Sequence, residues 1–288
     1  MPELPEVEVT AQHLAAAVQG ARLVSAHFSG KRLRHPFPRQ AMASLTGQRL
    51  RQVGRRAKYL LLEFDPGWVA VHLGMSGVMQ CCDPATAARL HDHVRLSFRP
   101  DSGDAIDVVF HDPRRFGSFQ WIGRADLGND QDLGELLGES ARGLEPFDPA
   151  FDGDFLYQQS RGKTTPIKHW LMAGQTVVGV GNIYACEALF ESGIHPGRAA
   201  GSISKPRYQS LAAAIRRILA AAIASGGSTI SDFLGPDGQA GRYGQSHRVY
   251  DHEGAPCPRC ASMGNPRAKI RRMVQQQRST FYCCVCQR

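Results

Sequence analysis

The sequence contains no long run of apolar residues and no secretion signal. None of its 288 residues belongs to a stretch approaching the about 20 consecutive apolar residues that span a bilayer. The N-terminus lacks the basic and apolar segments of a signal peptide. Internal repeats and low-complexity tracts are also missing. These absences argue against a membrane protein, a secreted protein and a repeat array, and we expect a cytoplasmic protein without membrane contact.

Acidic residues are scarce relative to basic ones. Lys and Arg total 34 against 26 Asp and Glu, which gives a formal net charge of +8 at pH 7. Such an excess favours a polyanionic partner such as nucleic acid, although many ordinary enzymes are also basic. Hydrophobic residues make up 42% of the chain, enough for two domains of ordinary size with sizeable cores.

Four of the eight cysteines stand in two Cys-x2-Cys pairs near the C-terminus, Cys257 with Cys260 and Cys283 with Cys286. Disulfides are not expected in a cytosolic chain, and two such pairs are typical of a tetrahedral zinc site with thiolate ligands. The alternative is a pair of redox dithiols, because the 22 intervening residues slightly exceed the usual about 15–20. We expect one structural zinc ion, Zn(2+), per chain. The remaining cysteines are expected outside this site: Cys81, Cys82, Cys186 and Cys284.

The spacing of apolar residues changes along the chain. Val7, Ala11 and Leu14 predict a helix over residues 5–19. Residues 22–122 contain short β-type runs separated by turn residues, which favours an antiparallel sandwich or barrel. The runs are 59–64, 68–73, 94–98, 106–110 and 118–122.

The second half is predicted to be helical. Residues 124–135 are polar and rich in turn residues, as in a linker or hinge. Helices are expected over 165–172, 182–192 and 206–225, with Asn182 as a plausible cap. Residues 228–246 are predicted to form a long loop.

The second residue is a proline, so removal of Met1 would expose a secondary amine at Pro2. An α-amino group is neutral in roughly a tenth of molecules at pH 7, against about four in ten thousand for a free lysine. The amine is therefore the more available nucleophile, and its attack on a sugar carbon gives a Schiff base. Glu3 could serve as general acid or base. The alternative is that the acidic residues merely complement a helix dipole.

Motifs along the whole chain resemble those of the bacterial formamidopyrimidine-DNA glycosylases, which excise oxidised purines such as 8-oxoguanine. The resemblance implies an α+β fold with an N-terminal helix and antiparallel β-sandwich, then a helix-two-turn-helix domain and a C-terminal zinc-finger β-hairpin. The expected divisions are 1–123, a hinge at 124–140, 141–248 and 249–288. The motifs occur in family order: MPELPEVEV, RRAKYLLLEF, HLGMSG, HDHV, HDPRRFG, VGVGNIYACEALFESGIHP, GGSTISDFLGPDG and QRSTFYC.

The resemblance implies a bifunctional DNA glycosylase and AP lyase that nicks DNA by β,δ-elimination. Pro2 would attack the sugar C1′ and form a covalent imine, with Glu3 as general acid or base and Glu6 supporting the site. Lys58 would lie near the phosphates and assist β-elimination; the alternative is an exposed strand lysine. Arg278 would hold the phosphates that flank the lesion and assist the second elimination.

The resemblance also implies a set of DNA contacts. Met75, Arg114 and Phe116 would fill the space that a flipped-out base leaves. Without the resemblance, Met75 and Phe116 would be taken for core residues. The loop 228–238 would close over the flipped base. Phosphate contacts are implied for four residues: His91, Lys163, Lys168 and Asn182.

Two other functions deserve comparison with this one. A non-catalytic zinc-ribbon DNA-binding protein would have no use for Pro2, Glu3 and Lys58 together. The endonuclease VIII group, which prefers oxidised pyrimidines, typically has Gly where this chain has Leu4 and lacks the Met, Arg and Phe fillers. We therefore expect a base excision repair enzyme acting on duplex DNA that contains oxidised purines. Nothing in the sequence requires a dimer, so a monomer is expected.

The chain departs from the family pattern at two places. The segment between the two cysteine pairs is longer than usual, and the added residues lie in a basic stretch, MGNPRAKIRRMV. We expect a longer hairpin tip or a disordered basic bulge, either of which could add a DNA contact. Ala173 stands where family members often carry an aspartate, which puts one local hydrogen bond in doubt.

Overall fold

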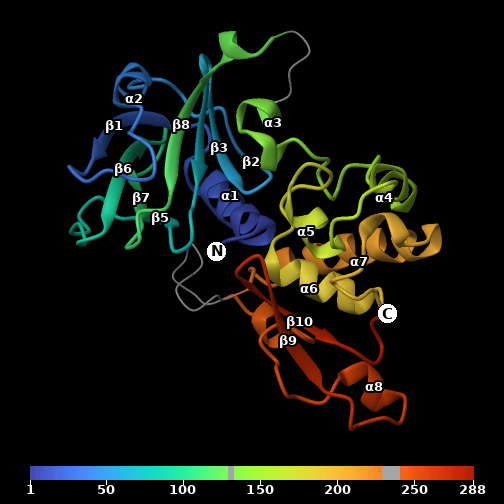
Figure 1. Cartoon of the computed structure of the whole chain (residues 1–288). Helices are drawn as coiled ribbons and strands as arrows, with labels where there is room; N and C mark the ends of the chain where they lie inside the picture. The colour runs from blue at the N-terminus through green and yellow to red at the C-terminus, as the bar shows by residue number, and fades with distance from the viewer. Residues whose placement is uncertain (129–132, 229–240) are drawn as a thin grey trace. The chain divides into compact units, whose positions relative to one another are not determined.

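The structure, a computed structural model, describes residues 1–128, 133–228 and 241–288, which form two compact units (Figure 1). Unit 1 consists of Met1–Leu137 with Ile223–Gly244, and unit 2 of Gly138–Ala222 with Gln245–Arg288. Within the described ranges, every helix is too short or too polar to span a bilayer.

Unit 1 is built on two four-stranded antiparallel sheets, in the orders β1-β6-β7-β5 and β2-β3-β4-β8 (Figure 1). This arrangement confirms the predicted sandwich. The elements are α1 Leu4–Val18, β1 Arg22–Phe28, α2 Arg39–Ser44, β2 Gln52–Arg56, β3 Tyr59–Phe64, β4 Gly67–His72, β5 Val78–Cys82, β6 Asp92–Arg99, β7 Ile106–His111, β8 Ser118–Gly123, η1 Arg124–Asp126 and α3 Leu133–Leu136.

Helix α1 lies where its apolar face can join the core of the sheets. Val7, Ala11, Leu14 and Val18 are buried in one cluster with residues from both sheets. Strand β3 alternates strictly between partly exposed and buried residues, as expected for a strand with one face on the core. Because α1 packs against β2 and β3, the N-terminal residues are held on the β2–β3 hairpin (Figure 1).

Unit 2 combines helices with a C-terminal antiparallel hairpin. The hairpin strand β10 packs against α6, and α5 packs against α6 (Figure 1). The predicted helical character of this half is confirmed. The elements are η2 Glu139–Ala141, α4 Gly153–Ser160, α5 Ile167–Met172, α6 Asn182–Glu191, η3 Ala200–Ser202, α7 Lys205–Ala224, η4 Tyr243–Ser246, α8 Pro258–Ser262, β9 Ile270–Gln275 and β10 Arg278–Cys283.

The helices differ from the predictions in several details, because the short helices α2, α3, α4 and α8 were not predicted and the cap of α6 was misassigned. Gly181 occupies the N-cap of α6, so Asn182 is the first helical residue rather than the cap. Helix α4 was not predicted because it contains few apolar residues. Its start is fixed by Asp152, whose carboxylate accepts a hydrogen bond from the backbone N–H of Phe155 at 2.7 Å.

Two predicted features fall partly outside the described residues. The expected hinge at 124–140 contains η1 and α3, and its residues 129–132 are not described. Of the loop expected to cover the flipped base, 228–238, only Ser228 is described.

Candidate functional site

The N-terminal residues of unit 1 form a buried acidic site. Pro2 is buried, and Glu3 and Glu6 are 2% and 0% exposed. The Glu6 carboxylate accepts hydrogen bonds from the backbone N–H of Glu3 and of Ser228, each at 2.8 Å. Glu6 therefore fixes both the turn that carries Pro2 and Glu3 and the start of the 228–238 loop.

The surroundings of the terminus favour a neutral amine. The pKa of the Met1 amine lies below its ordinary value of 8.0, chiefly because burial disfavours the charged form. Glu3 and Glu6 raise this pKa, whereas the positive charges of Lys58 and Arg114 lower it. Because the net shift is downward, an amine in these surroundings is available as a nucleophile at neutral pH.

Lys58 lies in the turn that joins β2 to β3, not within a strand, so the strand-lysine alternative is wrong. The turn is tight, with Ala57 at a positive φ of 54°. Arg55 secures the hairpin to α1 through an ion pair with Glu8 at 2.9 Å. The hairpin thereby brings the Lys58 charge close enough to lower the pKa of the terminal amine and of His72.

Met75 and Phe116 are exposed on two loops of unit 1. Their exposed fractions are 42% and 44%, so the interpretation of both as core residues is wrong. The Arg114 guanidinium lies over the Phe116 ring, 4.9 Å from its centroid. Exposed apolar side chains can insert into a base stack, and a guanidinium beside them can donate hydrogen bonds to a base.

His91 lies directly before β6 and is partly exposed. Its ring centroid lies 5.9 Å from that of His111 and 6.4 Å from that of His93. His111 in turn contacts Asp92 at 2.8 Å. A histidine on this surface can donate a hydrogen bond to a phosphate oxygen.

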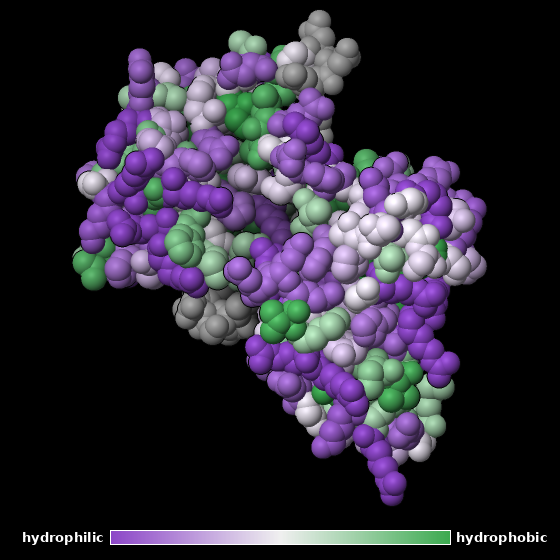
Figure 2. Space-filling model, viewed as in Figure 1, coloured by the Kyte–Doolittle hydropathy of each residue, from purple (hydrophilic) through white to green (hydrophobic). Residues whose placement is uncertain are grey.

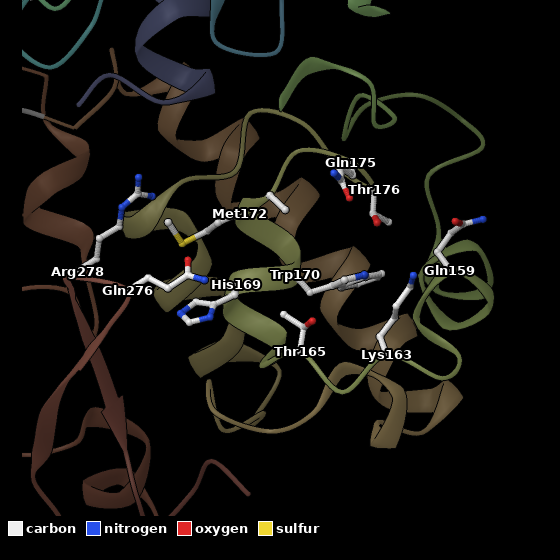
Figure 3. Close-up of a pocket in the computed structure, with 11 residues that line it drawn as sticks. Gln159, Lys163, Thr165, His169, Trp170, Met172, Gln175, Thr176, Gln276 and Arg278 are labelled. Atoms are coloured by element: carbon white, nitrogen blue, oxygen red, sulfur yellow. The ribbon is translucent and has the colours of Figure 1, made fainter. Parts of the chain in front are cut away.

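Unit 2 contains a pocket of about 630 Å³ with a basic lining (Figure 3). Lys163 lies on one side of the pocket in this view and Arg278 on the other, with Trp170 and His169 between them. Both cationic side chains are exposed. Arg278 begins β10 directly after a turn in which Gln276 and Gln277 both have positive φ, 45° and 60°. The turn projects Arg278 from the hairpin, where it can bind an anion.

Lys168 requires a correction, because its side chain is not on the surface. The residue is 1% exposed, and its ammonium donates hydrogen bonds to Thr280 Oγ1 and to the carbonyl of Ser279 at 3.3 Å. The predicted direct phosphate contact is therefore wrong for this structure. Asn182 lies beside it and donates from Nδ2 to the same Ser279 carbonyl at 3.0 Å. Both residues hold the strand that begins with Arg278.

The four predicted metal ligands of unit 2 converge. The Sγ atoms of Cys257, Cys260, Cys283 and Cys286 all lie within 4.8 Å of one another. Two of the Sγ–Sγ distances are 3.7 Å. Tetrahedral zinc with Zn–S bonds of about 2.3 Å places its sulfur atoms about 3.8 Å apart, so the cluster fits this ion. The structure thus supports a metal site of four cysteines.

Comparison with protein families gives matches over most of the chain. Residues 1–119 match the formamidopyrimidine-DNA glycosylase N-terminal domain, and residues 142–234 match the formamidopyrimidine-DNA glycosylase H2TH domain. The chain is 46% identical to the formamidopyrimidine-DNA glycosylase of Methylococcus capsulatus and 45% identical to that of Ralstonia nicotianae. Each match covers 100% of both proteins.

Solved structures with a similar fold contain DNA. The chain is similar to the Lactococcus lactis Fpg in complex with DNA containing an abasic site, with a TM-score of 0.84, 29% identity and 99% of each chain covered. It is also similar to MutM in complex with DNA containing carbocyclic 8-oxo-G, with a TM-score of 0.84, 29% identity and 100% of each chain covered.

Proposed function

The chain belongs to the formamidopyrimidine-DNA glycosylase family, and we propose that Pro2, freed by removal of Met1, is the nucleophile of its reaction. The protein is a DNA glycosylase and AP lyase of base excision repair that removes oxidised purines from duplex DNA. The assignment of Pro2 rests on the buried terminus. Glu3 and Glu6 are buried there, and the pKa of the Met1 amine beside them lies below its ordinary value.

The chemistry follows from a secondary amine. Attack of the Pro2 nitrogen on C1′ forms a C–N bond, and the glycosidic bond breaks with its electron pair leaving on the base. Protonation of the sugar ring oxygen opens the ring, a step for which Glu3 is the proton carrier. A secondary amine then yields a cationic iminium. Loss of the C2′ proton delivers the C–H bonding pair to this cation and gives an enamine. The enamine then expels the 3′ phosphate, which leaves with the C3′–O bonding pair, and a second elimination releases the 5′ phosphate.

Other residues of the chain support this reaction. Glu6 orients the turn through its two backbone hydrogen bonds. Lys58 adds to the lowering of the terminal amine pKa that burial chiefly causes, and it holds a phosphate near the reacting sugar. Arg278, projected from the hairpin turn of unit 2, binds the phosphates that flank the lesion and assists the second elimination.

Recognition of the DNA is assigned to exposed residues of both units. Met75 and Phe116 replace the stacking of the extruded base, and Arg114 hydrogen-bonds the base left without a partner. The loop 228–238 is proposed to cover the extruded base. Phosphate contacts are proposed for three residues: His91, Lys163 and Asn182.

The metal of the cysteine cluster is proposed to be one zinc ion. Four thiolates leave no coordination position for water or substrate, so the ion is structural. The ion contributes by holding the hairpin that carries Arg278. The proposal further includes a division of the chain into residues 1–123, 124–140, 141–248 and 249–288. It also includes action as a monomer and a location in the bacterial cytoplasm.

Single-turnover nicking of a duplex with 8-oxoguanine opposite cytosine tests these roles. We expect Pro2→Gly and Glu3→Gln each to lower the rate at least about 100-fold, the lower range for loss of a catalytic acid, base or nucleophile. Gln12→Ala, an exposed change on the same helix, should leave the rate unchanged. A Pro2→Gly enzyme with the wild-type rate would refute the assignment.

A further inference from the structure

Asp112 lies at the junction of the segments that carry the proposed DNA contacts of unit 1. It is completely buried, and both of its carboxylate oxygens accept hydrogen bonds. Oδ1 accepts from Ser76 Oγ at 2.9 Å and from the backbone N–H of Arg114 at 3.3 Å. Oδ2 accepts from the backbone N–H of Gly117 at 2.8 Å. One carboxylate therefore joins the loop of Met75 to the loop of Arg114 and Phe116.

The backbone of Asp112 ties a third segment to the same point. Its N–H donates to the carbonyl of His91 at 2.9 Å. Its carbonyl lies 3.1 Å from His93 Nε2, which must donate because a carbonyl only accepts. His93 Nδ1 is then an acceptor, and Ser29 Oγ lies 3.0 Å from it. The hydrogen bonds of Asp112 therefore also fix the position of the His91 backbone.

The two loops also touch through glycine. Gly74, one residue before Met75, has a φ of +71°, and a Cβ atom there would lie 2.6 Å from the backbone N of Gly117. Gly117 is equally confined, because its Cβ would lie 2.5 Å from the ring of Phe110. The backbones of the Met75 loop and the Arg114–Phe116 loop are therefore in direct contact at Gly74 and Gly117, which leaves no room for the two loops to shift independently.

We propose that Asp112 is a positioning residue that joins the Met75 loop and the Arg114–Phe116 loop into one rigid wedge. A buried carboxylate with three donors holds its partners strongly, because each donor released inside the protein would be left unsatisfied. Insertion of the wedge into the duplex then requires no separate ordering of either loop. The inference rests on the proposed DNA contacts of Met75, Arg114 and Phe116.

A comparison of two reactions of the same enzyme distinguishes this positioning role from an effect on overall stability. Excision of 8-oxoguanine requires a stacked base to be extruded and replaced, whereas a preformed abasic site has no base to extrude. Ser76→Ala removes only the hydroxyl that links the Met75 loop to Asp112. We expect it to slow single-turnover excision about 3- to 10-fold, the effect of one lost hydrogen bond, with less than a twofold change at an abasic site.

Asp112→Asn provides a second test, because its amide cannot accept from all three donors. It should lower the ratio of excision to abasic-site nicking in the same direction as Ser76→Ala. Thermal unfolding confirms that each variant is folded at the assay temperature. Ser160→Ala is the matched control, since Ser160 is also a buried, hydrogen-bonded serine but lies in unit 2. The ratio of excision to abasic-site nicking in Ser160→Ala should equal that of the wild type.

Phe116→Ala distinguishes failure of this inference from failure of the proposed DNA contacts. If Phe116→Ala lowers the ratio but neither Ser76→Ala nor Asp112→Asn does, the wedge is not organised by Asp112. If Phe116→Ala leaves the ratio unchanged, the contact itself is wrong. Equal slowing of both reactions in Ser76→Ala and Asp112→Asn would also overturn the inference, because it would indicate a structural role alone.

Discussion

At the scale of single residues, the terminal amine has the property on which the reaction depends. With Met1 present, burial is the main cause that lowers the pKa of the terminal amine, Lys58 and Arg114 lower it further, and Glu3 and Glu6 only partly oppose the shift. Once Met1 is removed, we expect the Pro2 amine to meet the same charges. The amine reacts in its neutral form, which predominates above the pKa. The rate of imine formation should therefore fall as the pH drops through a midpoint below 8.0.

Lys58→Gln tests the cause of that shift. Removal of a positive charge stabilises the protonated amine, so the midpoint of borohydride trapping on abasic-site DNA should move to higher pH. Trapping reports the imine itself, before the eliminations to which Lys58 also contributes. A midpoint that stays in place or moves to lower pH would contradict the electrostatic role of Lys58, and Gln12→Ala should reproduce the wild-type profile.

Lys163 and Lys168 form a matched pair of lysines, one exposed and one buried. Lys168→Met removes the buried donor to Thr280 Oγ1 and one of the two side-chain donors to the Ser279 carbonyl, so it should lower the free energy of unfolding by about 1–3 kcal/mol. Lys163→Met should leave stability unchanged and weaken DNA binding in a salt-dependent way. Urea unfolding and binding to abasic-site DNA measure both. Equal stability of the two variants would contradict the buried role of Lys168.

The sequence motifs indicated which residues are functional better than they indicated where the fold places those side chains. The motif around Lys58 indicated a functional lysine, but not that Ala57 adopts a positive φ and places it in a turn. Lys168 was assigned to the surface because nothing in the sequence reveals that Thr280, far along the chain, accepts its hydrogen bond. Asp112 was overlooked because its role depends on three segments that meet only in the fold. Its signal was present as the acidic residue of HDPRRFG.

At the scale of elements, the basic insert of the finger is the least expected feature. Residues 267–272 expose four basic side chains that line a groove of about 520 Å³, with Glu253 as its acidic member. The face of the molecule drawn in Figure 2 has both hydrophilic and apolar side chains on the finger. The groove lies at the end of the β9–β10 hairpin opposite the turn that precedes Arg278, so phosphates beyond the lesion are its expected partners. The four side chains are Arg267, Lys269, Arg271 and Arg272.

Replacement of these four residues by glutamine should reduce the salt dependence of binding. Each lost phosphate contact lowers the slope of log K against log salt by about 0.9. The measurement is binding to a long duplex containing an abasic-site analogue at several salt concentrations. Replacement of Arg49 and Arg51, which are paired with Asp101 and Asp65, is a control that removes two basic side chains elsewhere on the surface, and it should change the slope little. An unchanged slope in the fourfold variant would rule out a DNA contact by the insert.

Element type was predictable where the apolar period was strong, and the bounds of β3 and α1 were then predicted to within one residue. Helix α1 and strand β3 follow their periods closely, because each has one face on the core. Helix α4 was missed because its stability comes from Asp152 and tertiary packing rather than from an apolar stripe. The start of α6 at Asn182 was predicted, but its N-cap was assigned one residue too late, since Gly181 occupies the cap position without a side chain.

At the scale of the whole molecule, the metal cluster should control DNA binding without controlling the fold of unit 1. Its four ligands all lie in unit 2, together with the hairpin of Arg278. Purified protein should contain one zinc ion per chain by elemental analysis. Cys260→Ser should lower zinc content and DNA affinity, whereas Cys284→Ser, at an exposed position outside the cluster, should change neither. Wild-type affinity in metal-free protein would contradict a structural zinc site.

The order of the domains was predictable from the motifs, but the composition of the compact units was not. Residues Ile223–Gly244 belong with the N-terminal unit although they follow most of the helical half in sequence. The hydrogen bond between Ser228 and Glu6 helps to explain this grouping. Such a contact between distant segments has no local sequence pattern, so periodicity cannot reveal it.

Borohydride trapping followed by peptide mapping tests the central claim most directly. The substrate is a duplex with 8-oxoguanine opposite cytosine, and the enzyme is trimmed at Met1 and loaded with zinc. Reduction should leave the DNA joined to the N-terminal peptide through the Pro2 nitrogen, and Pro2→Gly should greatly weaken the adduct. An absent adduct, or one on a peptide carrying Lys58 instead, would contradict the account.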